Sequence, residues 1–251
     1  MYLAPSDRHL IVERSRIRLS SGPRENRHRP AVDVLFRSAA QAYGQRVIGI
    51  VLSGNLDDGT AGLVDIKTRG GITIVQYPED ANAPSMPANA IAAGDIDYIV
   101  PAAEIAPQVL SLVMEDKTER PVAADQNLIN LPNGGSRFAC PECGGALVQF
   151  EEGGLERFRC RVGHSYSPES LLEDQSDALE RTSWAGIRTL EEHSEFLERL
   201  ADRSSLHDRA RVAKRFQERA DSSREHAKTL RNLLDRAVEN RQLEMGEGTG
   251  T

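Results

Sequence analysis

The 251-residue chain carries 31 Lys and Arg residues against 38 Asp and Glu residues, a formal net charge of -7 at pH 7. This balance disfavours nonspecific nucleic-acid binding, which requires Lys and Arg to neutralise phosphates. No apolar run approaches the ~20 residues that span a bilayer, and the segment MYLAPSDRHL lacks the basic start and apolar core of a secretory signal. We therefore expect a cytoplasmic protein without membrane insertion.

Residues 1–116 alternate between short apolar runs and amphipathic stretches. The run VIGIVLS is continuously apolar, which is typical of a strand covered on both faces in a parallel sheet. The alternation predicts an α/β fold, a doubly wound parallel sheet that is incomplete. The expected strands are 9–12, 16–20, 47–53, 71–76 and 97–100, and the expected helices are 31–43, 60–69, 88–94 and 102–114.

The rest of the chain divides by composition. Residues 117–136 show no sustained period and predict a linker. Residues 137–166 contain two hairpin-like pieces around Gly pairs and predict a small zinc ribbon. Residues 167–240 predict an α-helical hairpin that starts with Ser167 as N-cap and breaks near SSLHD. We expect a disordered tail over 241–251.

Three cysteines and a histidine lie at the spacing of a metal site. Cys140 and Cys143 form a C-x-x-C pair, Cys160 follows the intervening hairpin, and His164 comes four residues later. Four such donors predict a tetrahedral, structural zinc ion, because no open coordination position is left for catalysis. The alternatives are a redox pair or idle thiols. A nucleic-acid-binding ribbon is disfavoured, because residues 137–166 hold four Arg against four Glu.

The stretch VLSGNLDDGTAGL places Asp57 and Asp58 at the C-terminal end of a predicted strand. Composition alone favours a capping role, since Asp at a helix N-terminus accepts hydrogen bonds from free N–H groups. The same edge of a parallel sheet is where α/β proteins place their chemistry. The residues themselves leave both interpretations open.

Several motifs together resemble one family. YLAPSDRHL, HRPAVDVLF, VLSGNLDDGTAGL, KTRGGITIVQ, SMPANAI and DYIVP follow the order and approximate spacing of the CheB protein-glutamate methylesterases. The resemblance implies a doubly wound sheet and the hydrolysis of glutamyl methyl esters, with deamidation of certain glutamines, on methylated chemoreceptors. It also implies that Asp58 is the acid of a Ser-His-Asp triad. Asp57 falls on a variable position, for which we expect a solvated or capping role.

Two departures from that family stand out. Asn55 and Leu56 replace its usual Met and Gly. The family's serine and histidine precede the YLAP segment, so we expect an N-terminally incomplete chain that is inactive alone. A misassigned start or a truncated gene is the expected cause, and a naturally shortened protein is the alternative. His9, His28 and Ser53 match family positions that are not catalytic. The alternative function is a noncatalytic chemosensory interaction module.

The helical hairpin carries a narrow apolar seam. Self-packing is the expected role of such a seam, with helix-mediated self-association as the alternative. Residues 207–236 carry nine Lys or Arg against five Asp or Glu, which would suit an acidic partner. The expected seam residues are Leu179, Ile187, Leu190, Leu197, Leu206, Ala210, Ala213, Phe216, Ala220, Ala227, Leu230 and Leu234.

Overall fold

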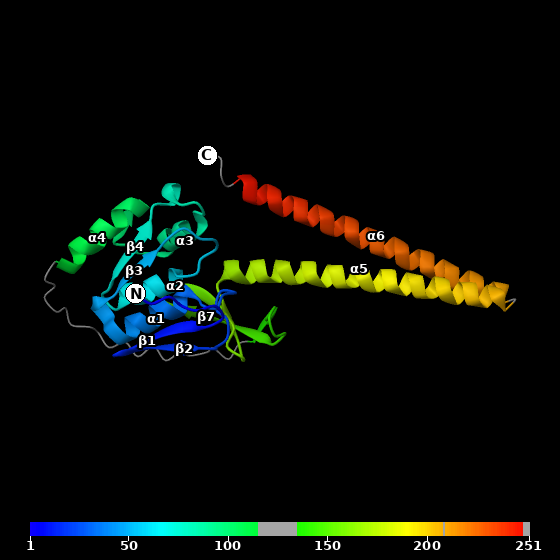
Figure 1. Ribbon diagram of the computed structural model, residues 1–251, viewed down its shortest axis with the longest axis horizontal. Coiled ribbons are helices and arrows are strands. Elements are labelled where there is room, and N and C mark those ends of the chain that lie inside the picture. Colours follow the sequence, from blue (N-terminus) through cyan, green and yellow to red (C-terminus); the bar gives the residue numbers. More distant parts are fainter. Residues whose placement is uncertain (115–134, 208, 248–251) are drawn as a thin grey trace. The chain divides into compact units, whose positions relative to one another are not determined.

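A computed structural model describes residues 1–114, 135–207 and 209–247 of the chain. The chain separates into two compact units, Met1–Asp174 and Gln175–Thr251 (Figure 1). The predicted linker over 117–136 falls outside the described residues, except for its last two positions. In the part of the chain that is described, no helix has both the length and the apolar character needed to cross a membrane.

The first two strands form a hairpin of their own. Strand β1 (His9–Glu13) pairs antiparallel with β2 (Arg16–Ser20), with His9 opposite Ser20. Both strands were expected from the sequence. They belong to a separate two-stranded sheet and not to the parallel sheet.

The central sheet contains three parallel strands. Strand β4 (Ile72–Gln76) lies between β3 (Ile48–Val51) and β5 (Tyr98–Val100). All five residues of β4 are buried, as expected for a strand covered on both faces. The continuously apolar run VIGIVLS forms the shorter strand β3, which is buried at Gly49 and Val51 but only half-buried at Ile48 and Ile50. Short 3-10 turns at Gly44–Arg46 and Pro78–Asp80 precede β3 and follow β4.

Helices cover both faces of this sheet. The four helices are α1 (Val32–Tyr43), α2 (Thr60–Thr68), α3 (Ser85–Ala93) and α4 (Ala102–Met114). One core cluster joins Val51 and Val75 to residues of α1, α2 and α3, and a second joins Ile72 and Ile74 to α4. Because alternate residues of a strand point to opposite faces, the two clusters lie on opposite sides of the sheet. The predicted α/β fold with helices on both faces is confirmed.

A second, antiparallel sheet follows. Its strands β6 (Gly135–Ala139), β7 (Ala146–Glu152), β8 (Leu155–Cys160) and β9 (Ser165–Tyr166) pair in that order around a small core. Two backbone hydrogen bonds tie it to the preceding region: the Asn26 amide donates to the Ser165 carbonyl at 2.8 Å, and the Ser165 amide donates to the Arg24 carbonyl at 3.3 Å. Both regions therefore lie in the first compact unit, while the finer domain boundaries stay a prediction.

Two long antiparallel helices complete the described chain. Helix α5 (Pro168–Leu206) begins where the sequence predicted, because the Ser167 hydroxyl accepts a hydrogen bond from the Ser170 amide at 3.0 Å. Helix α6 (Ala210–Glu247) follows the predicted break. The Ser194 hydroxyl donates to the Ala220 carbonyl at 3.0 Å, joining the two helices. The predicted helical hairpin is confirmed.

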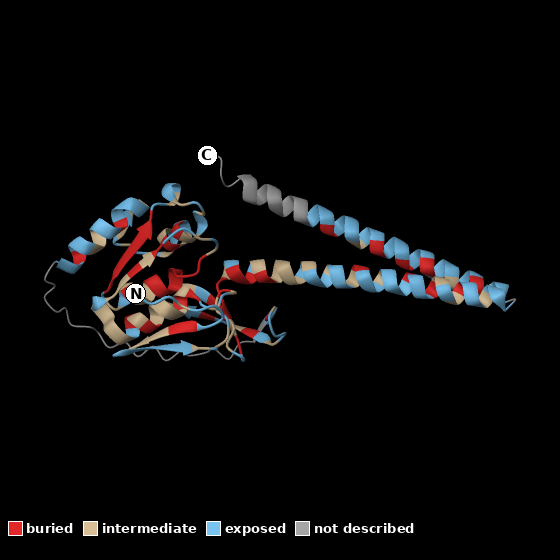
Figure 2. Ribbon diagram, in the orientation of Figure 1, coloured by how far each residue is buried: buried red, intermediate tan, exposed pale blue. Residues whose placement is uncertain are grey.

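Two details of the hairpin differ from the prediction. Leu179 and Leu206 are 67% and 85% exposed, and Ala210 is exposed, so the seam is shorter than expected (Figure 2). Leu206 ends α5 and Ala210 begins α6, so both lie where the chain turns between the two helices. Helix α6 continues to Glu247, through part of the predicted disordered tail. Gln, Leu, Glu and Met favour helix, and no Gly occurs in this helix before Gly246. The last four residues lie outside the described part.

Candidate functional site

The turn between β3 and α2 buries two adjacent carboxyl groups. Asp57 and Asp58 are each only 6% exposed, directly before the α2 N-cap Gly59. Gly59 has φ of 101°, a left-handed conformation that glycine adopts without a steric penalty. We expected Asp57 to be solvated or to cap a helix, and its burial shows that the solvated role was wrong, because the turn folds inward against α1 and the start of α5.

Asp58 caps a helix, but not the helix that follows it. Its Oδ2 accepts from the Val32 amide at 2.7 Å, and its Oδ1 accepts from the Asp33 amide at 3.1 Å. These amides belong to the first turn of α1, where backbone N–H groups have no partner within the helix. The capping interpretation is therefore correct in kind, and the neighbouring helix α1 is the one that is capped.

Asp33, in the first turn of α1, caps α2 in the same way. Its Oδ1 accepts from the Gly59 and Gly62 amides at 3.0 and 2.8 Å. The side-chain amide of Asn26 donates to Asp33 Oδ2 at 2.7 Å and to Asp58 Oδ1 at 3.3 Å. Asp58, which lies just before α2, therefore caps α1, and Asp33, which lies in α1, caps α2. Asn26 donates hydrogen bonds to both carboxylates. Sequence reasoning missed Asp33 and Asn26, although an acid in the first turn of a helix was a usable signal.

The two acids of the turn are hard to ionise. Burial, followed by the nearby Asp33 carboxylate, raises the pKa of Asp58 to about 7. Burial also raises the pKa of Asp57 to about 6, against the lowering effect of a hydrogen bond from Ser167. The guanidinium of Arg157, from β8, lies 3.4 Å from Asp33 Oδ2. A positive group beside Asp58 would stabilise its ionised form and lower its pKa.

The contacts of Asp58 leave room for one more donor. A carboxylate has about four lone-pair directions, and three N–H donors occupy Asp58. An imidazole N–H could occupy the fourth, as in a Ser-His-Asp triad. Among the described residues, no histidine hydrogen-bonds to Asp58.

Two of the three candidate substitutes for the missing triad members, His9 and Ser53, have structural roles. His9 accepts from the Ala31 amide at 3.2 Å through Nδ1, and its Nε2 lies 2.9 Å from the Pro23 carbonyl. The Ser53 hydroxyl accepts from the Ala83 amide at 2.8 Å. His28 lies at the surface.

The four predicted metal ligands come together. The ligand atoms of Cys140, Cys143, Cys160 and His164 all lie within 4.8 Å of one another. The Cys143 and Cys160 sulfurs are 3.7 Å apart, and His164 Nδ1 lies 3.6 Å from the Cys140 sulfur and 3.5 Å from the Cys160 sulfur. A tetrahedral zinc ion with ordinary bond lengths requires about 3.8 Å between sulfurs and about 3.6 Å between sulfur and nitrogen. The cluster could therefore bind a metal ion.

The geometry defines an α/β domain with a buried acid at the carboxyl edge of a parallel sheet, followed by a Cys3His module. Comparison with known proteins agrees. Residues 1–109 match the family model described as CheB methylesterase. This part of the chain is therefore homologous to the CheB methylesterase catalytic domain. The Cys3His module and the helical pair lie beyond the match.

Individual relatives are also similar to part of this chain. The chain is 43% identical over 108 residues to protein-glutamate methylesterase/protein-glutamine glutaminase 1 of Geobacter metallireducens, covering 41% of this chain and 30% of the relative. It is 39% identical over 123 residues to the enzyme of that name from Yersinia pestis bv. Antiqua, covering 47% and 35%. The chain thus spans about a third of these relatives' length.

One solved structure is also similar. The Thermotoga maritima CheB methylesterase catalytic domain is 33% identical, with a TM-score of 0.43, over 44% of this chain and 61% of that one.

Proposed function

We propose that this protein takes part in the hydrolysis of glutamyl methyl esters, and in the deamidation of glutamines, on methylated chemoreceptors in the cytoplasm. The observations that carry the proposal are the 39–43% identity over 108 and 123 residues to enzymes of that name and the family match over residues 1–109, which include the Asp58 turn. Asp58 is the proposed acid of the triad.

The surroundings of Asp58 suit that role. The acid of a triad orients the imidazole and stabilises the imidazolium that forms when the serine loses its proton. Two backbone amides of α1 and the side-chain amide of Asn26 donate three hydrogen bonds to Asp58. Among the described residues no cation pairs with this buried carboxyl group, and its pKa is raised. The serine and histidine have no counterpart among the described residues, so we expect these 251 residues by themselves to be inactive.

The Cys3His module is proposed to hold one structural zinc ion. Four protein donors would complete a tetrahedral shell, so no position would remain for water or substrate. The ion would close two loops around a core of six buried residues, which is a small core for a sheet of four strands. Metal analysis of freshly prepared, unchelated protein tests this proposal, and a sample without zinc would contradict it.

Methanol release from methylated chemoreceptors tests the enzymatic proposal. The assay compares the protein as its native cell makes it with Asp58→Asn and with Asp202→Asn, an exposed acid on α5. Loss of the triad acid should lower kcat by about 10⁴-fold, while Asp202→Asn should leave it unchanged. Equal turnover by Asp58→Asn would contradict the role of Asp58.

A noncatalytic interaction module is the second candidate. It is favoured by one observation: every hydrogen bond that the structure gives Asp58 serves backbone or Asn26, which is what a purely structural cap requires. Absence of methanol release from the native protein, combined with retained binding to chemoreceptors, would support this candidate over the enzyme.

A further inference from the structure

Asn26 lies between the two carboxylates of the buried network but belongs to neither of the capped helices. It is 1% exposed and precedes α1, in the loop of residues 23–28. Its side-chain amide donates to Asp33 at 2.7 Å and to Asp58 at 3.3 Å. A donor of this kind orients the carboxylate that accepts from it and stabilises the ionised form. Asn26 therefore influences both the orientation and the charge of Asp58.

The backbone of Asn26 is held by the Cys3His module. The Asn26 amide donates to the Ser165 carbonyl at 2.8 Å, and Ser165 is fully buried. Asn26 and Arg27 have φ of 48° and 70°, in the left-handed region that residues other than glycine adopt infrequently. Such a backbone persists where surrounding contacts determine it. The hydrogen bond to Ser165 is one of these contacts.

The two metal-ligand turns of the module make further contacts with the same loop. In the C-x-x-C turn, Glu142 pairs with Arg24 at 2.8 Å. In the turn before His164, Gly163 lies so close to Pro23 that a Cβ atom on Gly163 would be 3.0 Å from the proline ring. A metal ion bound by the module would fix both turns, and the contacts of both turns would then fix the loop.

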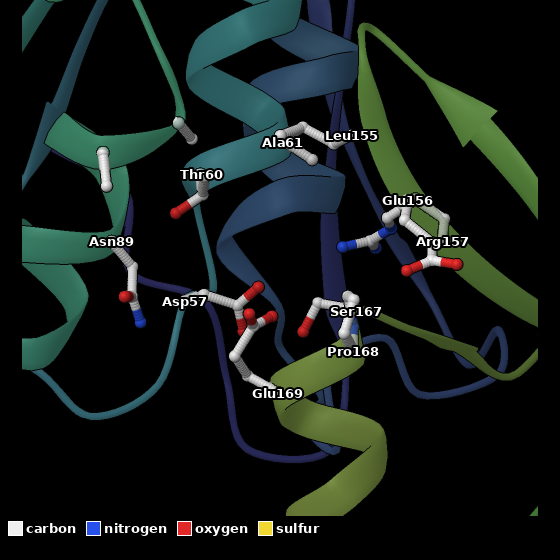
Figure 3. Close-up of a pocket in the computed structure, with 12 residues that line it drawn as sticks. Asp57, Thr60, Ala61, Asn89, Leu155, Glu156, Arg157, Ser167, Pro168 and Glu169 are labelled. Atoms are coloured by element: carbon white, nitrogen blue, oxygen red, sulfur yellow. The ribbon is translucent and has the colours of Figure 1, made fainter.

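Strand β8 and the start of α5 close the other side of the network. Figure 3 shows Arg157 of β8, Ser167 and Asp57 around one cavity of about 250 Å³. The Arg157 guanidinium lies 3.4 Å from Asp33 Oδ2, the same atom that accepts from Asn26. The antiparallel sheet therefore contacts both side chains that lie against the carboxylate of the Asp58 turn.

We propose that Asn26 is a positioning residue for the triad acid Asp58, and that the Cys3His module holds Asn26 in place. The proposal rests on the proposed methylesterase function, because the acid of a triad acts by orienting a histidine. Asn26 acts through Asp58, whose two oxygens it holds in one orientation together with the amides of α1. Full activity would then require a module that lies beyond the residues matched to the family.

The variant Asn26→Gly tests the positioning role. It removes the side-chain amide and keeps the left-handed backbone without strain. In the methanol-release assay on the native protein, it should lower kcat about tenfold and leave KM unchanged, because one hydrogen bond to a charged group is lost and no contact with substrate is removed.

Ser15→Gly is the matched control. Ser15 also has a positive φ, 75°, but it lies in the exposed turn between β1 and β2. This substitution should change neither kcat nor KM.

Carbon NMR of the Asp58 carboxyl group in the 251-residue chain gives a readout that does not require catalysis. Asn26→Gly should raise the pKa of Asp58 above that of wild type, because the lost amide donor favours the ionised carboxylate. The Asp33 carboxylate also faces Asp58 and is present in both proteins. A variant that only loosened the fold would admit water and lower the pKa towards its ordinary value.

Metal removal tests the contribution of the module. Chelation of the zinc-loaded chain should speed hydrogen exchange of the Val32 and Asp33 amides, which donate to Asp58, by about tenfold. Renewed addition of zinc should restore their protection. The amides of β4, in the central sheet, are the control and should stay protected, because the expected change is local and not global unfolding.

Three results would overturn the proposal. The first is equal kcat in active wild type and Asn26→Gly, and the second is an unchanged or lowered pKa of Asp58 in that variant. The third is unchanged exchange of the Val32 and Asp33 amides after metal removal. Absence of methanol release from native wild type would instead contradict the proposed function, and the titration and the exchange would still decide whether Asn26 and the module hold Asp58.

Discussion

The two compact units use charged residues in opposite ways. In the first unit, Arg157 and Asp33 are 2% and 0% exposed, and they form part of a network that joins two helix N-termini. In the second unit, the side chains of Arg224 and Glu198 pair across the two helices at 56% and 38% exposure. Removing one partner of a buried pair leaves an uncompensated charge, whereas an exposed group regains water. The same kind of contact should therefore matter greatly in one unit and little in the other.

Metal removal should have the largest effect. Cys143→Ser is expected to release zinc and to remove amide protection over residues 137–166, because metal binding on the order of 10 kcal/mol contributes to the folding of small modules of this kind. The loss should extend to the Asn26 amide, which donates to the Ser165 carbonyl. Hydrogen exchange by mass spectrometry measures both.

The control for this variant is Val162→Ser, which changes an exposed residue of the same module that is not a ligand. It should keep both zinc and protection. Unchanged protection in Cys143→Ser, despite loss of the metal, would show that the antiparallel sheet does not depend on the ion.

Asp33→Ala should have the second largest effect. It leaves the Gly59 and Gly62 amides without their acceptor and leaves Arg157 buried beside an empty space. We expect a loss of about 3 to 5 kcal/mol in the free energy of unfolding of the first unit. Exchange of the β4 amides reports this unit, whereas the single tryptophan, Trp184, lies in the second.

Asp202→Ala is the comparison for Asp33→Ala. The same side chain is removed from an exposed position of α5, so the expected change is within about 0.5 kcal/mol. A loss below about 1 kcal/mol for Asp33→Ala would mean that the exchange of caps between α1 and α2 contributes little to stability.

Glu198→Gln should have the smallest effect. The variant removes the charge that pairs with Arg224 but keeps a side chain of similar size. An exposed pair contributes about 0 to 1 kcal/mol, so thermal unfolding of the hairpin, followed through Trp184, should shift by a few degrees at most. A shift as large as that of Ile187→Ala, which truncates a buried residue of α5, would contradict the contrast between the units.

The features that the sequence could predict are local. The parallel strands follow from continuous apolar runs, the start of α5 follows from Ser167 and Pro168, and the metal ligands follow from short spacings. Each of these signals is contained in a few neighbouring residues. Periodicity was less reliable at Leu179, because a heptad-like position predicts a face and not the presence of a partner on it.

The features that the sequence could not predict depend on contacts between distant residues. Asp58 caps α1, which begins 26 positions earlier along the chain, and no local pattern distinguishes this from capping α2. The contribution of Arg157 to the same network comes from the antiparallel sheet, far along the chain. The docking of that sheet is what buries Arg157, Asp57 and Ser167 together.

The titration of Asp58 tests the central claim, that this acid is buried and held by α1 and that no described residue places a cation beside it. Its raised pKa means that the native state keeps a proton that the unfolded state, at an ordinary 3.8, has released. The free energy of unfolding of the first unit should therefore fall as pH rises from about 4 to about 7, and this contribution should be constant above that range.

Carbon NMR of the Asp58 carboxyl group, in protein labelled at aspartate and assigned with Asp58→Asn, measures this pKa directly. The account predicts a midpoint near 7 in the 251-residue chain, well above the ordinary value of 3.8. A midpoint at or below 3.8 would contradict it, because the carboxylate would then be either solvated or already paired with a positive group.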